Sequence, residues 1–184
     1  MTVLFLLMGG IGLLVMLLIV LYNRLVRLRN MVREGWSGID VQLKRRANLI
    51  PNLIETVKGY MGHERGLLEK VTELRSQSMK TGNLSEKQQV ESALTGGLAR
   101  LFAVAEGYPE LKANQNFQDL QHQLSEIEDQ IQLARRYYNG TVRNLNIAIE
   151  SLPGNLVAGW FAFQTAEFFE IDKPGDRAVP QVGF

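Results

Sequence analysis

The chain has 184 residues, with 20 Lys and Arg, 19 Asp and Glu, two His, no Cys and a formal net charge of +1. This length fits one domain of modest size, or one domain with an anchor. The absence of Cys excludes a disulfide framework, a thiol nucleophile, and iron–sulfur or Cys-containing zinc sites, and two His leave little for histidine-based chemistry. The charge is unevenly placed: residues 1–23 carry no charged side chain, residues 24–46 carry seven basic and two acidic ones, and the remainder carries 13 basic and 17 acidic ones.

Residues 3–22 form an apolar run. As a helix this run would extend about 30 Å at ~1.5 Å per residue, which matches the hydrocarbon core of a bilayer. Tyr22 ends the run and Arg24 follows it closely, as expected for residues that hold a span at the membrane surface. A cleaved signal peptide would need a positive stretch before the run and a small-residue cleavage site after it, and the sequence offers neither. We therefore predict a retained transmembrane anchor over residues 1–23.

Four arginines follow the span closely: Arg24, Arg27, Arg29 and Arg33. The positive-inside rule then predicts an outside N-terminus and a cytoplasmic body. The same arginines are expected to contact anionic lipid headgroups, each contributing about 1 kcal/mol near the surface. Nucleic acid is not an expected partner, because the basic residues stop at Arg46, aromatic residues are not interleaved with them, and the body is acidic.

The span contains three glycines close together, Gly9, Gly10 and Gly12. Small residues let membrane helices approach closely, so these glycines predict a packing face. Gly is also common in membrane helices in general, and the sequence does not decide between the two interpretations.

Between residues 24 and 152, apolar residues recur at the three- and four-residue spacing of helices, which predicts an all-α fold. No turn signal separates this pattern from the anchor. We therefore expect the span to continue as a long amphipathic helix as far as Met79. Pro51 removes one backbone hydrogen bond and predicts a kink over residues 46–51, and Gly62 adds a second weak point.

Two further helices are predicted. Ser85 and Gln88 form a capping box that starts the first of them, and the second extends from Asn114 to Leu152. Apolar residues of the latter alternate steps of three and four as a heptad seam with one stutter: Phe117, Leu120, Leu124, Ile127, Ile131, Ala134, Tyr138, Val142, Leu145 and Ile149. The spacing alone fits a bundle or an intermolecular coiled coil, but the helix lengths favour a bundle of two long antiparallel helices with the shorter one alongside. This cytoplasmic antiparallel bundle is predicted over residues 24–152.

Residues 153–184 are predicted to hold an aromatic C-terminal helix, from Asn155 to Phe169, and an irregular tail. The aromatic residues include Trp160, Phe161, Phe168 and Phe169. Closure of the bundle is the favoured role of this segment, with docking on a second subunit or on the membrane as alternatives. Repulsion from anionic lipid argues against membrane docking, since acidic residues lie nearby: Glu167, Glu170, Asp172 and Asp176.

Catalytic patterns are largely missing from the sequence. Asp119 and His122 stand one helical turn apart, but a di-iron site in a helical bundle needs two Glu-x-x-His pairs and two further Glu. Both residues flank the heptad seam, which predicts an exposed polar face instead. We therefore expect no enzyme activity, no cofactor and no metal.

Several motifs resemble the LemA family over nearly the whole chain. The matching segments are residues 22–30, Glu34-Gly35-Trp36-Ser37-Gly38 and onward to Arg46, Asn48-Leu49-Ile50-Pro51-Asn52-Leu53, residues 57–60, Tyr108-Pro109-Glu110-Leu111-Lys112-Ala113-Asn114, residues 126–128, Ala134-Arg135-Arg136-Tyr137-Tyr138-Asn139, Asn144 and residues 168–170. The resemblance implies a bacterial inner-membrane protein with one N-terminal span and an antiparallel helical bundle, and no accepted enzymatic activity. It also implies links to membrane stress, to membrane-protease neighbours and, in magnetosome relatives, to membrane invagination.

The most specific of these motifs surrounds Pro51 with polar residues, namely Lys44, Arg45, Arg46, Asn48 and Asn52. A proline kink frees backbone carbonyls, and Asn and Arg side chains are suited to satisfy them. The same side chains are also expected to pair with carboxylates on the last long helix, such as Glu126 or Asp129. An internal hydrogen-bonded kink is favoured over a binding site.

Two functions follow from these features. The first is a non-enzymatic, membrane-anchored scaffold that forms a homo-oligomer and organises or shapes the bacterial membrane. The second is an adaptor that docks on another membrane protein, such as a membrane protease. Membrane lipid is an expected partner in both. The candidate oligomer contacts are Gly9, Gly10, Gly12, Trp160, Phe161, Phe168 and Phe169.

Overall fold

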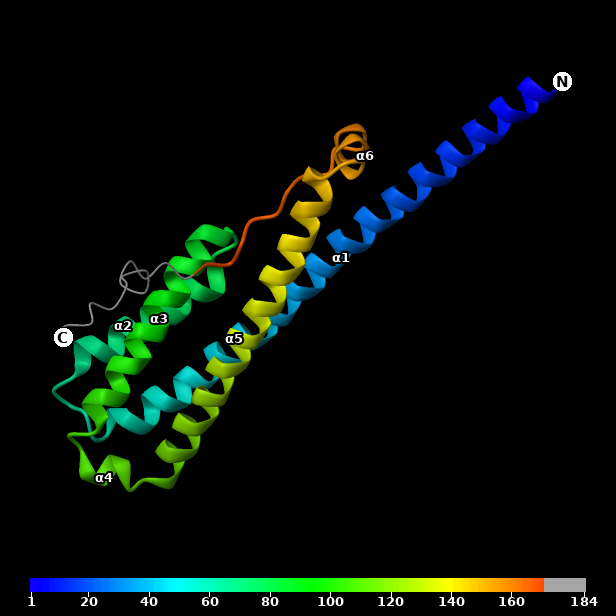
Figure 1. The fold of residues 1–184 in the computed structure, drawn as a ribbon. Coiled ribbons are helices and arrows are strands. Elements are labelled where there is room, and N and C mark those ends of the chain that lie inside the picture. The colour runs from blue at the N-terminus through cyan, green and yellow to red at the C-terminus, as the bar shows by residue number, and fades with distance from the viewer. Residues whose placement is uncertain (171–184) are drawn as a thin grey trace, which may run out of the picture. The chain divides into compact units, whose positions relative to one another are not determined.

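A computed structural model describes residues 1–170, and every regular element in them is a helix, which confirms the all-α fold (Figure 1). The helices are α1 (Thr2–Lys58), α2 (Arg65–Lys80), α3 (Leu84–Ala105), α4 (Pro109–Lys112), α5 (Gln115–Glu150) and α6 (Gly154–Trp160). They form two compact units. The span unit contains Met1–Asp40 and Gln132–Phe168, and the bundle unit contains Val41–Ile131 with Phe169 and Glu170. The predicted tail residues Asp172 and Asp176 lie outside the described residues.

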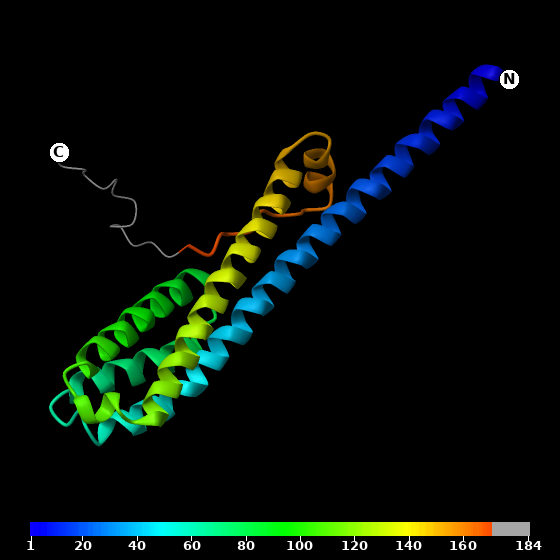
Figure 2. The same cartoon turned by 60° about the horizontal axis from the view of Figure 1, so that its bottom comes forward.

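In the span unit, the C-terminal part of α5 runs antiparallel to α1, and α6 lies beside both (Figure 2). The first part of α1 is long and apolar enough to cross a membrane, and none of its apolar window is buried by protein. A small core begins where this apolar part ends. It contains Leu25, Val157 and Ala158, with Leu18, Leu21, Ala148, Ile149 and Phe163 packed around them.

A glycine sets the distance between α1 and α5 in the span unit. A Cβ atom on Gly35 would lie 3.1 Å from the Cα atom of Tyr138 and 3.4 Å from the hydroxyl oxygen of Thr141. The Tyr138 ring also meets Trp36 edge-on, with 5.9 Å between ring centroids. The two backbones therefore approach closely only because residue 35 has no side chain.

The Tyr138 hydroxyl donates a hydrogen bond of 2.9 Å to the backbone carbonyl of Glu167. Burial, with a smaller contribution from the negative charge of Glu167, raises the pKa of this hydroxyl above its ordinary value. The hydroxyl therefore keeps its proton at physiological pH and fixes residues 166–167 to α5. Asn146 completes this attachment, because its side chain both donates to and accepts from the backbone of Ala166.

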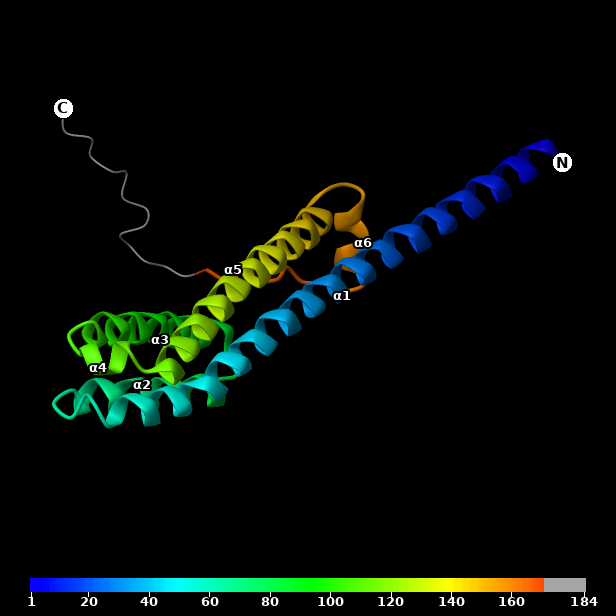
Figure 3. The same ribbon diagram turned by 90° about the horizontal axis from the view of Figure 1, so that it is seen from below.

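In the bundle unit, the end of α1 and the first half of α5 pack with the antiparallel pair α2 and α3 (Figure 3). Each helix places an apolar stripe in a shared core. The buried members are Ile50, Leu53, Val57, Met61, Leu68, Val71, Leu74, Leu94, Leu98, Leu101, Ala105, Leu111, Phe117 and Leu124. Leu111 belongs to α4, the single turn that connects α3 to α5.

The first long helix ends earlier than the sequence predicted. Instead of reaching Met79, α1 stops at Lys58, and a turn over residues 59–64 separates it from α2. Gly59 and Gly62 both lie in this turn, and the low helix propensity of Gly explains why the helix breaks here. The weak point expected at Gly62 is therefore a complete reversal of the chain that adds a helix to the bundle.

The other helix ends follow the prediction with small differences. The cap of α3 is Asn83, whose side chain accepts from the Ser85 backbone N–H at 2.9 Å, so Ser85 is not the capping residue. Asn114 caps α5 by accepting from the Phe117 N–H, and the ten residues of the predicted seam on α5 are all buried or partly buried. The predicted C-terminal helix ends at Trp160 instead of Phe169, because the following chain is held extended by Tyr138 and Asn146.

Replacing Gly35 by Ala tests the close approach of α1 and α5. We expect Gly35→Ala to lower the free energy of unfolding by about 1–3 kcal/mol, because the new methyl group meets the backbone of Tyr138. Gly38→Ala is the matched control, since a Cβ there has no neighbour within 4 Å and Ala favours a helix over Gly by up to ~1 kcal/mol. Thermal unfolding of the detergent-solubilised protein, followed by circular dichroism, measures both. Equal effects of the two variants would contradict the packing argument.

Candidate functional site

A buried charge cluster joins α1, α2, α3 and α5 in the bundle unit. Arg46 on α1 is 2% exposed, and its guanidinium donates to the Glu91 carboxylate on α3. The other terminal nitrogen donates to the Glu128 carboxylate on α5 and to the Thr95 hydroxyl, each at 2.7 Å. Ser78 on α2 donates to the second oxygen of Glu91. One arginine thus connects α1, α3 and α5, and Glu91 brings in α2.

The cluster holds one positive and two negative formal charges. Removing such charges from water costs several kcal/mol for each ion, and only close pairing with additional hydrogen bonds offsets that cost. Glu91 is almost fully enclosed and has both oxygens engaged, whereas Glu128 remains partly exposed. Arg46 Nε is buried without a hydrogen-bond partner. The arrangement therefore depends on Arg46, because both carboxylates pair with its guanidinium.

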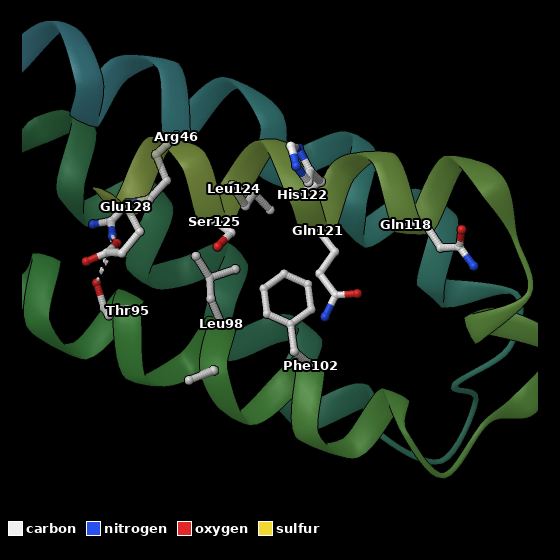
Figure 4. A pocket seen from close by; sticks show the side chains of 11 residues that line it. Arg46, Thr95, Leu98, Phe102, Gln118, Gln121, His122, Leu124, Ser125 and Glu128 are labelled. Atoms are coloured by element: carbon white, nitrogen blue, oxygen red, sulfur yellow. Dashed lines mark hydrogen bonds and ion pairs between the residues drawn. The ribbon is translucent and has the colours of Figure 1, made fainter. Parts of the chain in front are cut away.

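An apolar groove lies next to this cluster, between α3 and α5 (Figure 4). Its volume is about 510 Å³, and Arg46, Thr95 and Glu128 lie at one end of it. Its walls are formed by Leu98, Ala99, Phe102, Leu124 and the polar side chains of Gln118, Gln121, His122 and Ser125. The groove can accept an apolar segment, and its polar groups can form hydrogen bonds at the rim.

The carbonyl that Pro51 leaves without a helical hydrogen bond has a specific partner on another helix. Pro51 lies inside α1, and because proline has no N–H, the carbonyl four residues earlier loses its helical hydrogen bond. That carbonyl belongs to Ala47, and Arg75 Nε on α2 donates to it at 2.7 Å. An arginine does satisfy the freed carbonyl, as the sequence suggested. It comes from α2, outside the motif.

The remaining motif residues have separate environments. Arg45 is exposed and donates to Gln42. Asn48, Pro51 and Asn52 are exposed as well. Arg45 and Asn48 line a second hollow together with the expected partners Glu126 and Asp129, but the buried pairing on α5 is made by Glu128. The carboxylate partner was therefore predicted on the correct helix and at the wrong residue.

The other predicted site residues are mostly exposed. Arg24, Arg27, Arg29 and Arg33 all lie on the surface of α1. Gly9, Gly10 and Gly12 have open space around them. Trp160, Phe161 and Phe168 are exposed, whereas Phe169 is buried. Asp119 and His122, which were predicted to lie on an exposed polar face and not in a site, are exposed, and His122 lies 3.6 Å from Glu126.

Sequence reasoning missed Ser78, Glu91, Thr95 and Arg75. Glu91 carried a readable signal, because it stands in the apolar stripe of α3 next to Val90 and one turn before Leu94. A carboxylate in a buried stripe requires a buried cation. Arg75 carried no such signal, since an arginine near the end of a polar helix is ordinary.

Comparison with known proteins gives consistent matches. A family model described as the LemA family matches residues 35–184. Magnetosome protein MamQ 2 of Paramagnetospirillum magneticum is 25% identical over 188 residues, which cover 88% of this chain and 69% of the relative. Magnetosome protein MamQ of Magnetospirillum gryphiswaldense is 23% identical over 193 residues, 90% of this chain and 71% of the relative. Protein LemA of Metamycoplasma hominis is 30% identical over 141 residues, which cover 74% of this chain and 63% of the relative.

Replacing Arg46 by Met tests whether the cluster depends on its one cation. We expect Arg46→Met to lower the free energy of unfolding by about 3–5 kcal/mol, because Glu91 is left buried without a cation. Arg45→Met, at the exposed neighbouring position, should change it by no more than ~0.5 kcal/mol. Denaturant titration in detergent measures both.

A double variant separates charge from packing at the same position. Arg46→Met combined with Glu91→Leu removes both buried charges, so it should recover part of the stability lost in the single variant. A double variant less stable than Arg46→Met alone would contradict the charge argument, because removing the unpaired Glu91 carboxylate would then relieve no cost.

Proposed function

Since this chain belongs to the LemA family, we propose that it is a non-enzymatic, membrane-anchored scaffold that self-associates and organises or shapes the bacterial membrane. Membrane association is supported by the family and by the apolar start of α1. Two of the matched relatives carry the name magnetosome protein. The resemblance to the LemA family implies a link between magnetosome relatives and membrane invagination, and this link supports the shaping role.

One observation carries the proposal. α1 is a single helix of 57 residues, and it contains both the apolar span and a side of the bundle core. The same helix therefore supplies the membrane anchor and part of the bundle core. A scaffold needs both parts, because the span holds the protein at the bilayer while the bundle offers surface for contacts with other copies.

The site chemistry also suits a scaffold better than an enzyme. In the Arg46 cluster, the carboxylate that is nearly fully enclosed has both oxygens engaged. A general base needs a carboxylate within hydrogen-bond reach of a substrate. The cluster instead has the properties of a structural ion pair that fixes four helices in register.

We assign self-association to the glycine face of the span. Gly9, Gly10 and Gly12 have no neighbouring atoms that a side chain would meet, so a second span can approach the helix backbone there. We place the protein in the bacterial inner membrane with its N-terminus outside and its bundle in the cytoplasm, since the exposed arginines follow the span on its C-terminal side.

An adaptor role is the second candidate, and the groove between α3 and α5 favours it. Its walls include Leu98, Phe102 and Leu124, with polar residues at the rim, which is the surface that an amphipathic segment of another membrane protein requires. In this case the anchor would hold the groove near its partner at the membrane.

Light scattering in detergent distinguishes the two roles. The scaffold proposal predicts a protein mass that is a multiple of the chain mass. Gly9→Leu combined with Gly12→Leu should reduce that multiple, because leucine side chains hold the spans apart. Leu6→Ile combined with Leu17→Ile is the control, since it keeps the volume of the span unchanged. A monomeric wild-type protein would contradict the scaffold and favour the adaptor.

The orientation is tested with single cysteines, which the chain otherwise lacks. Lys80→Cys, at the exposed end of α2, should resist an impermeant thiol reagent in intact cells and react after the cells are opened. Thr2→Cys should react in intact cells, because the positive-inside rule places it outside. The reverse labelling pattern would overturn the proposed topology.

A further inference from the structure

The segment that contains α6 is apolar, uncharged and open to its surroundings. Residues 151–166 contain no charged side chain. Four large apolar side chains in this stretch are exposed, namely Leu152, Leu156, Trp160 and Phe161, and Trp160 is 79% exposed. Exposed apolar side chains grouped in this way mark a contact surface.

The position of α6 along α1 identifies what this surface meets. Its buried residues Val157 and Ala158 pack on Leu25, with Leu18 and Leu21 alongside. The Phe161 ring lies 4.8 Å from the Tyr22 ring, centroid to centroid. All of these α1 contacts fall between Leu18 and Leu25, that is, in the last two turns of the apolar span and the first turn beyond it. α6 therefore lies at the level where the span leaves the hydrocarbon core.

We propose that α6 and the turn before it form a second membrane contact, inserted into the boundary between lipid headgroups and acyl chains beside the end of the span. Trp160 and Phe161 supply aromatic rings that favour this boundary, and Leu152 and Leu156 supply the apolar surface. The lipid bilayer is the occupant that the fold provides here, because the adjoining part of α1 is itself apolar and uncovered.

Glu167, one of the acidic residues that argued against lipid contact, does not lie with α6. The chain after α6 runs back along α5, where Tyr138 binds the carbonyl of Glu167. Tyr138 packs against Trp36, which is fourteen residues beyond Tyr22 on α1, or about 21 Å at ~1.5 Å per residue. Glu167 is thus well separated from the proposed membrane contact.

Basic residues complete the site on its polar side. The Arg29 guanidinium lies 5.0 Å from the centre of the Phe163 ring, so the exit of the span combines a cation with aromatic residues. Arg24 and Arg27 are exposed on the same stretch of α1. These cations attract anionic headgroups. α6 lies in the boundary between the headgroups and the acyl chains.

Tryptophan fluorescence tests the proposal, because the chain has two Trp, Trp36 and Trp160. The full chain is reconstituted at low protein content in vesicles of zwitterionic and anionic phospholipid, with bromine atoms on the acyl chains near the headgroup. In Trp36→Phe, the emission of Trp160 should shift to shorter wavelength and lose most of its intensity to bromine quenching. Trp160→Phe reports Trp36 and is the matched control, which should be quenched several-fold less.

Each other outcome overturns the proposal. Long-wavelength, unquenched Trp160 emission would place α6 in water. Short-wavelength emission without quenching would show that protein, such as a second copy, covers α6. Equal quenching of Trp36 and Trp160 would show that the contact is not confined to α6. The difference between wild type and Trp160→Phe gives the same reading without altering Trp36, and the result does not depend on self-association.

Discussion

The buried guanidinium of Arg46 is the constraint on which the bundle unit depends. A charge with 2% exposure is tolerated only where anions and hydrogen-bond acceptors surround it. Those groups come from Glu91, Thr95 and Glu128 on two other helices. The cluster therefore connects α1, α3 and α5 at defined positions, and a shifted register would leave a buried charge without its partner.

The proline motif lies next to this cluster and adds a second polar connection between α1 and its neighbours. Arg46 and Ala47 are adjacent, and each receives its partner from a different helix: the guanidinium from α3 and α5, the Ala47 carbonyl from Arg75 of α2. Pro51 frees that carbonyl by lacking an N–H. A short stretch of α1 thus carries two polar connections to its neighbours, and the exposed Asn48 and Asn52 are not needed for either.

Much of this arrangement was predictable from the sequence, and the misses have physical reasons. The seam of α5 was readable because apolar residues recur at steps of three and four from Phe117 to Ile149, with a single stutter. The chain reversal after Lys58 was only partly readable: the low helix propensity of Gly59 and Gly62 marks a weak point, but it does not say whether the helix bends there or ends, which tertiary packing decides. Glu128 was missed in favour of Glu126 and Asp129, since a pairing across 82 residues depends on helix rotation, which periodicity leaves free by one or two positions.

The distribution of polar and apolar groups points to surfaces as the functional parts of this protein. In the bundle unit, Glu91 and Arg46 are committed to one another and to Ser78 and Thr95, so little of their chemistry is left for a substrate. In the span unit, large apolar side chains remain exposed from Leu152 to Phe161, although burying them would stabilise the fold. The paired charges of the bundle unit and the uncovered apolar rings of the span unit fit the membrane association of the LemA family, and they support the proposed contact of α6 with lipid.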